Sequence, residues 1–102
     1  MEKVPLSSIL EEFTVLPAYP NPFNPSTTIT YGINEDSKVT IDIYDITGQL
    51  INKLLNSYQE QGWHSVEWNG TDSNNNQVPA GIYLSKITSN NDTKTTKLML
   101  LK

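Results

Sequence analysis

The sequence predicts an all-β protein in which two antiparallel sheets pack face to face. Short runs with alternating apolar residues recur along the chain, and each ends in a cluster of Gly, Pro, Asn, Asp or Ser. No amphipathic segment of normal helix length lies between them. Turn signals at intervals of roughly 8–12 residues are typical of a sandwich or barrel, and short connections favour antiparallel neighbours. We therefore expect an immunoglobulin-like β-sandwich of about seven strands with Greek-key connections.

The expected strands follow one another with short turns between them. The clearest covers residues 38–44, where every second side chain is apolar, as in a half-buried strand. In chain order, the strands are expected at residues 13–16, 28–31, 38–44, 49–55, 62–68, 82–88 and 95–101. The expected core comprises Val39, Ile41, Ile43, Val66, Trp68, Tyr83 and the Leu-rich end of the chain.

The composition argues against several classes of protein. A chain of 102 residues is expected to form one domain with one modest core. The net charge is −4, and the sequence contains no Arg, which disfavours nucleic-acid binding because that depends on clustered basic residues. The absence of Cys rules out a disulfide and a Cys-based zinc site. No apolar run approaches the roughly 18 residues of a membrane-spanning helix.

Residues 1–10 are expected to be a linker, and residues 11–102 the sandwich domain. Ser8 and Glu11 fit a capping pattern that allows one helical turn, although a single turn is not stable alone. The linker lacks the charge and apolar pattern of a secretory signal peptide. Any export signal would therefore lie upstream, in a larger parent protein.

Three prolines precede the second expected strand, in the stretch YPNPFNPSTTITY at residues 19–31. Proline fixes φ and donates no ladder hydrogen bond, so we expect a stiff, polyproline-like segment along a sheet edge or across one end of the sandwich. Phe23 is expected to anchor it to the core. Such a segment would protect an edge from pairing with another chain, or offer a pre-organised surface to a receptor. Its residues are Pro20, Asn21, Pro22, Phe23, Asn24 and Pro25.

No group of residues predicts catalysis. His64 is the only histidine, and a lone His favours a strand side chain bonded to a nearby loop over a metal ligand. Neither a carboxylate pair nor a nucleophile with a base stands out. We therefore expect a protein that is not an enzyme and that holds no cofactor.

A weak calcium candidate lies in the Asn-rich loop of residues 69–81. Asp72, Asn74 and Asn76 alternate like the first ligands of a calcium loop. The Glu that completes such a loop is missing, however, so an ordinary hairpin turn is favoured.

Several motifs in order resemble one known family, the type A C-terminal sorting domains of the type IX (Por) secretion system. YPNPFNPSTTITY resembles the family's first motif, and VTIDIYDITGQLI (residues 39–51) its central hairpin. GWHSVEWNGTDSNNNQVPAGIYL (residues 62–84) resembles its Gly-x-His-x-Val-x-Trp block, and KLMLLK (residues 97–102) its terminus. The Ig-like domain of flagellar hook-capping proteins shares the core pattern. Further motif positions are Gly48, Gly62, His64, Val66, Trp68, Gly70, Gly81 and Tyr83.

The chain departs from the family pattern in two places. Asn69 stands where the family usually has Asp, and residues 74–76 are Asn where the family has Gly. Because Asn tolerates left-handed backbone geometry better than most residues do, the turn is expected to survive.

The resemblance implies a secretion signal at the end of a larger exported protein. Outer-membrane secretion machinery would recognise the domain, and a sortase-like protease would remove it from its N-terminal cargo. The product would be secreted or held at the cell surface, after passage through the periplasm and outer membrane. We expect the last strand to offer free backbone groups to the receptor. The expected recognition residues are Lys97, Leu98, Met99, Leu100, Leu101 and Lys102.

Two other functions share the predicted fold. A carbohydrate-binding or spacer module beside a secreted glycosidase would use exposed aromatic side chains, for which the candidates are Tyr19, Tyr58 and Trp63. A structural assembly domain, like that of hook-capping proteins, would instead associate with itself. Fold alone does not choose among these functions.

Overall fold

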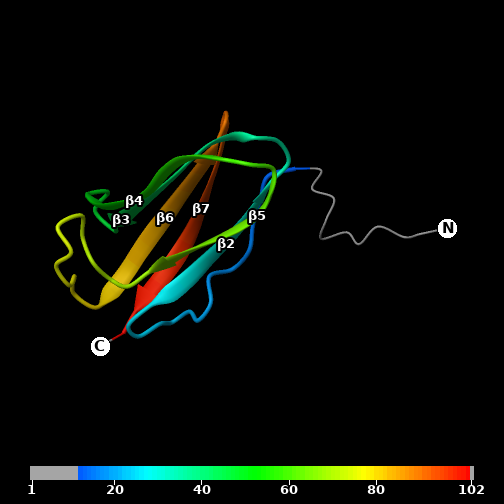
Figure 1. The fold of residues 1–102 in the computed structure, drawn as a ribbon. Coiled ribbons are helices and arrows are strands. Elements are labelled where there is room, and N and C mark those ends of the chain that lie inside the picture. The colour runs from blue at the N-terminus through cyan, green and yellow to red at the C-terminus, as the bar shows by residue number, and fades with distance from the viewer. Residues whose placement is uncertain (1–11, 102) are drawn as a thin grey trace.

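Two antiparallel sheets stack face to face and form the sandwich that the sequence predicts (Figure 1). The computed structural model describes residues 12–101, so the expected linker, Glu11 and Lys102 lie outside the described residues. Within residues 12–101 there is no helix, and so none that could cross a membrane. The strands are β1 (Thr14–Val15), β2 (Thr27–Ile33), β3 (Ser37–Asp45), β4 (Leu50–Gln59), β5 (Gly62–Trp68), β6 (Gly81–Ser89) and β7 (Asp92–Leu100).

The sheet order puts the last strand at an edge. The smaller sheet has the order β1-β2-β5, and the larger has the order β4-β3-β6-β7. All neighbouring strands are antiparallel, as predicted. The chain crosses between the sheets after β2, β4 and β5, and β6 returns to pair with β3. Consequently β7 has β6 on one side and no strand on the other.

Most of the observed strands are longer than the predicted ones, although β1 is shorter and β5 has its predicted bounds, and β4 runs furthest past its predicted end. Its predicted end is Leu55, whereas the strand continues to Gln59. The pairing of β3 with β4 contains two register shifts, one of them between Ile41 and Asp42. Each shift adds an extra residue to β4, and both lie within the predicted part of the strand. Residues 56–59 were missed because they read NSYQ and show no alternation of apolar side chains.

Three aromatic rings form the centre of the core. The indole of Trp68 lies between Phe23 and Tyr83, with ring centroids 5.6 Å and 5.3 Å apart, respectively. The indole Nε1–H donates to the carbonyl of Thr71 at 2.8 Å, so the one polar atom of this side chain is satisfied. The predicted core is largely confirmed, except that Val66 is only partly buried and Leu101 is exposed. Buried predicted members are Val39, Ile41, Ile43, Trp68, Tyr83, Leu98 and Leu100.

Replacing Trp68 with Ala should lower the free energy of unfolding by about 3–5 kcal/mol, because it leaves a cavity between two rings. The matched control is Trp63→Ala on the opposite face of β5, where the side chain is 38% exposed. We expect a clearly smaller loss there. Urea unfolding followed by circular dichroism measures both values, and equal losses in the two variants would contradict this description of the core.

Candidate functional site

Residues 19–25, which we call the collar, connect the two sheets at one end of the sandwich. Tyr19 pairs with Thr28 of β2 through two backbone hydrogen bonds of 3.1 and 2.9 Å. The hydroxyl of Thr27 donates to the carbonyl of Pro20 at 2.7 Å and holds the turn closed. The chain bends at residues 20–22 and again at residues 24–25, so the expectation of a polyproline-like conformation is wrong. The expectation that it lies along an edge is confirmed.

The collar pairs with the outer edge of β7. The N–H of Phe23 donates to the carbonyl of Met99, and the N–H of Leu101 donates to the carbonyl of Phe23, both at 2.9 Å. This is a parallel bridge between Phe23 and Leu100. In Figure 1 the blue lead-in reaches the same end of the sandwich as the C-terminus.

The side chain of Asn21 extends this pairing by two further bonds. Its Nδ2 donates to the carbonyl of Lys97 at 2.8 Å, and its Oδ1 accepts from the N–H of Met99 at 2.9 Å. A carboxamide carries a donor and an acceptor in one plane, as a peptide group does. Asn21 therefore takes the place of a backbone unit in the ladder, which a proline-rich segment has few N–H groups to supply.

Phe23 anchors the collar, as predicted. Its side chain is 1% exposed and packs on Trp68. The loop after Trp68 approaches closely at the same point: a Cβ on Gly70 would lie 3.3 Å from the Leu100 side chain, and its φ is +73°. Only glycine meets both conditions without strain. One motif glycine thus allows the loop to reach the collar and the end of β7.

Part of the expectation for the last strand is wrong. We expected free backbone groups at residues 97–101, but Asn21 and Phe23 already occupy the outward groups of Lys97, Met99 and Leu101 named above. Among the expected recognition residues, Leu98 and Leu100 are buried in the core. Lys97, Met99 and Leu101 have side chains at least partly open to solvent, and Lys102 lies outside the described residues. Their role in recognition stays a prediction.

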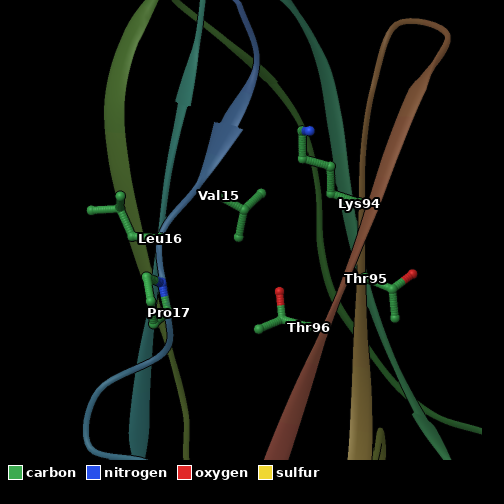
Figure 2. Close-up of a pocket in the computed structure, with 6 residues that line it drawn as sticks. All are labelled: Val15, Leu16, Pro17, Lys94, Thr95 and Thr96. Carbon is green, nitrogen blue, oxygen red and sulfur yellow. The ribbon is translucent and has the colours of Figure 1, made fainter.

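The other half of the β7 edge, Asp92 to Thr96, is not covered by the collar. Here a groove of about 490 Å³ opens between the two sheets. One wall is β1 with the residues after it, and the other is β7, and Figure 2 shows the two walls facing each other. Its lining consists of Val15, Leu16, Pro17, Lys94, Thr95 and Thr96.

His64 has the structural role predicted for it. Its Nε2 lies 2.6 Å from the carbonyl of Glu60, in the turn between β4 and β5. Its ring stacks on Tyr31 across the strand pair, with centroids 5.5 Å apart.

The turn between β3 and β4 depends on Asp45 and Gly48. Asp45 Oδ1 accepts from the N–H groups of Thr47 and Gln49 and from the Thr47 hydroxyl. The Thr47 hydroxyl and these amides lower the pKa of Asp45 below its usual value, although slight burial opposes them. Gly48 takes a φ of +90°, for which glycine is favoured.

The calcium candidate forms a self-contained turn. Asp72 Oδ1 accepts from the N–H groups of Asn74 and Asn76, both at 2.9 Å. Asn75 has a φ of 67° and takes the left-handed geometry expected of this Asn run. Within residues 12–101 no three His, Cys, Asp or Glu side chains cluster as metal ligands. The arrangement favours the hairpin interpretation.

The three exposed aromatic candidates are not gathered on one surface. Tyr58 is 74% exposed on β4, in the larger sheet. Tyr19 is 80% exposed and pairs with Thr28, whereas Trp63 lies opposite Gly32. Four residues of β2 separate these two places, about 13 Å along a strand. No common sugar-binding platform results.

The comparisons assign the family. Residues 24–93 match the family described as FlgD Ig-like domain.

The chain belongs to this family.

The matched segment begins inside the collar and ends in β7, so it includes most of the sandwich. No curated protein sequence matches the chain.

Solved structures share the FlgD Ig-like fold with this chain. Latent PorU from Porphyromonas gingivalis superposes with a TM-score of 0.70 at 22% identity, over 90% of this chain and 10% of that one. PorZ, an essential surface component of the type IX secretion system of the same organism, gives 0.57 at 22% identity, over 88% and 11%. FlgD from Xanthomonas campestris, which is linked to hook capping, gives 0.60 at 24% identity, over 86% and 66%.

The chain therefore spans about a tenth of the length of PorU and PorZ. At these identities the likeness shows a common fold.

The sequence did not reveal the bonding of Asn21 to β7 or the groove. The one available signal was the polar run of residues 92–97, because Lys and Thr without an apolar partner are typical of an exposed edge strand.

If Asn21 completes the ladder, Asn21→Ala should speed amide exchange of Met99 by roughly fivefold to tenfold, since one hydrogen bond contributes about 1 kcal/mol. Hydrogen–deuterium exchange measured by NMR reads this out residue by residue. Asn21→Asp should speed the exchange of Met99 no more than Asn21→Ala does. It keeps the oxygen that accepts from the Met99 N–H and loses only the group that donates to Lys97.

The matched control is Asn24→Ala, because Asn24 is exposed and makes no side-chain hydrogen bond within the described residues. It should leave the exchange of Met99 unchanged. Unaltered exchange in Asn21→Ala would contradict the assigned pairing.

Proposed function

We propose that this domain is a C-terminal sorting signal of a larger exported bacterial protein, recognised by the type IX secretion machinery at the outer membrane. Support comes from the ordered motifs that resemble the sorting family and from the fold shared with PorU and PorZ. The fold is also shared with FlgD, so it does not by itself separate secretion from flagellar assembly.

The observation that carries the proposal is the pairing of the collar with the end of β7. The proline motif and the terminal KLMLLK motif stand at opposite ends of the sequence, yet four hydrogen bonds join them. The two parts of the resemblance therefore form one surface. Asn21 of the collar lies on it together with the open side chains of Lys97, Met99 and Leu101.

The partners follow from this role. The receptor would be outer-membrane secretion machinery, and the cargo would be attached at the N-terminal side of the domain. A sortase-like protease would cut between them during surface attachment or release. The protein would act at the cell surface or in the medium, without catalysis of its own and without a cofactor.

Family membership favours one second candidate, a structural assembly domain of the flagellar type. Such a domain would associate with copies of itself or with filament proteins and would not need type IX machinery. The carbohydrate-binding alternative has no support, because the exposed aromatic residues lie apart.

The export test uses a reporter preceded by a signal peptide and followed by residues 1–102. In a bacterium with type IX secretion, we expect the reporter at the surface or in the medium. In an otherwise identical strain without that machinery, it should stay in the periplasm. Cell fractionation with immunoblotting measures the distribution, and periplasmic retention in both strains would contradict the proposal.

The double variant Lys97→Glu/Leu101→Ser should lower export about tenfold, which corresponds to roughly 1.4 kcal/mol of receptor binding. Both side chains are exposed, so the fold should persist, and thermal melting of the purified domain checks this. Lys38→Glu, at an exposed position of β3, is the matched control and should export normally. Normal export of the double variant would show that these side chains are not the recognition surface.

A further inference from the structure

One side of the sandwich is half closed and half open. The collar covers β7 at Lys97, Met99 and Leu101 and stops there. Beyond it, the groove between β1 and β7 begins. The same sheet edge thus already forms hydrogen bonds with another segment along part of its length, and the outward backbone groups continue along the remaining part.

The backbone of the open half points outward at every second residue. On a strand, successive residues direct their N–H and C=O groups to opposite sides. Because Met99 bonds the collar with both groups, Thr95 and Thr93 must point the same way, away from β6. No strand of the described chain lies on that side of β7. Water is their alternative partner, and an added strand would replace it.

The opposite wall of the groove, β1, is also an edge strand and pairs only with β2 within the described residues. Leu16 donates its N–H to the carbonyl of Thr30, so the neighbouring Val15 directs its backbone away from β2. In Figure 2 the side chain of Val15 lies toward the β7 wall, and Thr96 points back toward it. Alternate side chains of a strand added to β7 would enter this groove and meet Val15, Leu16 and Pro17.

Lys94 supplies a charge to the groove. Its ammonium group lies 5.9 Å from the centre of the Phe13 ring, and it forms no ion pair within residues 12–101. A cation beside an apolar wall matches an extended segment that carries apolar side chains and a carboxylate.

We propose that the open half of the β7 edge binds an extended acidic-apolar segment of a partner protein, which adds to the larger sheet as a fifth strand at Thr93 and Thr95. This inference rests on the proposed function, since the partner would belong to the secretion machinery. It places a second contact beside the surface formed by the collar and the end of β7.

A second copy of the chain fits the edge less well. Antiparallel self-pairing about Thr95 would set Thr93 of one copy opposite Lys97 of the other, whose carbonyl already accepts from Asn21. It would also place Lys94 of one copy diagonally across the ladder from Lys94 of the other, on the same face of the sheet. Two ammonium groups that share one face of a strand pair repel each other, which favours a partner that brings negative charge.

The test is Thr95→Pro in the export assay. Proline removes the outward N–H while the pairing with β6 continues through Lys94 and Thr96. The matched control is Asn56→Pro at the other edge of the same sheet. By the same alternation, carried across β6 and β3, Asn56 also points its N–H outward.

We expect Thr95→Pro to lower export at least about tenfold, and Asn56→Pro to export like the wild type. Lys94→Glu leaves the backbone unchanged. It therefore tests the same edge even if Thr95→Pro lowers the melting temperature of the domain. It should lower export as well, whereas Lys38→Glu should not.

Normal export of both Thr95→Pro and Lys94→Glu, with wild-type export intact, overturns this inference and leaves the proposed function standing. Failure of wild-type export overturns the proposed function and this inference together. Light scattering that shows a dimer in the wild type and a monomer in Thr95→Pro would assign the edge to a second copy. Slow Thr95 amide exchange that becomes fast when residues 1–10 are removed would assign it to the chain's own N-terminal segment.

Discussion

The hydrogen bonds along the outer edge of β7 are the constraint on which the arrangement of this domain depends. A strand at the edge of a sheet presents N–H and C=O groups that pair with any extended chain within reach. Here the collar, a segment of the same chain, forms hydrogen bonds with part of this edge through Phe23 and the side chain of Asn21. The last strand is thereby tied to residues more than seventy positions earlier.

That pairing also explains the composition of the collar. Prolines limit the number of N–H groups that the segment can offer to a foreign chain. Phe23 and Asn21 then supply the donors that β7 needs, one from the backbone and one from a carboxamide. The Phe23 side chain anchors the segment to the core by packing on Trp68. Gly70, which has no side chain, lets its loop pass close to Leu100 and Pro25. The collar therefore contacts both the core and the edge of the larger sheet.

The collar covers only the C-terminal half of the β7 edge, and this makes the two halves different. The covered half joins the first and the last motif of the resemblance into one surface, whereas the other half retains outward backbone groups beside a groove. In a sorting domain, the first would display side chains and the second would accept a strand. In an assembly domain, the same edge would form contacts between subunits. Both candidate functions would therefore use the outward backbone groups of β7.

The sequence by itself determined the class of fold, the places of most strands along the chain and most of the core, because alternating side chains and turn residues are local features of the chain. Residues 38–44 show this clearly, since every apolar position expected to be buried there is buried. It also indicated that a proline-rich segment lies on an edge, because proline cannot enter a ladder. Only the tertiary structure decided which edge that is, that Asn21 bonds Lys97 and Met99, and that Leu98 and Leu100 face the core. These facts depend on pairing between distant segments, and no local periodicity carries information about which strand a given edge will meet.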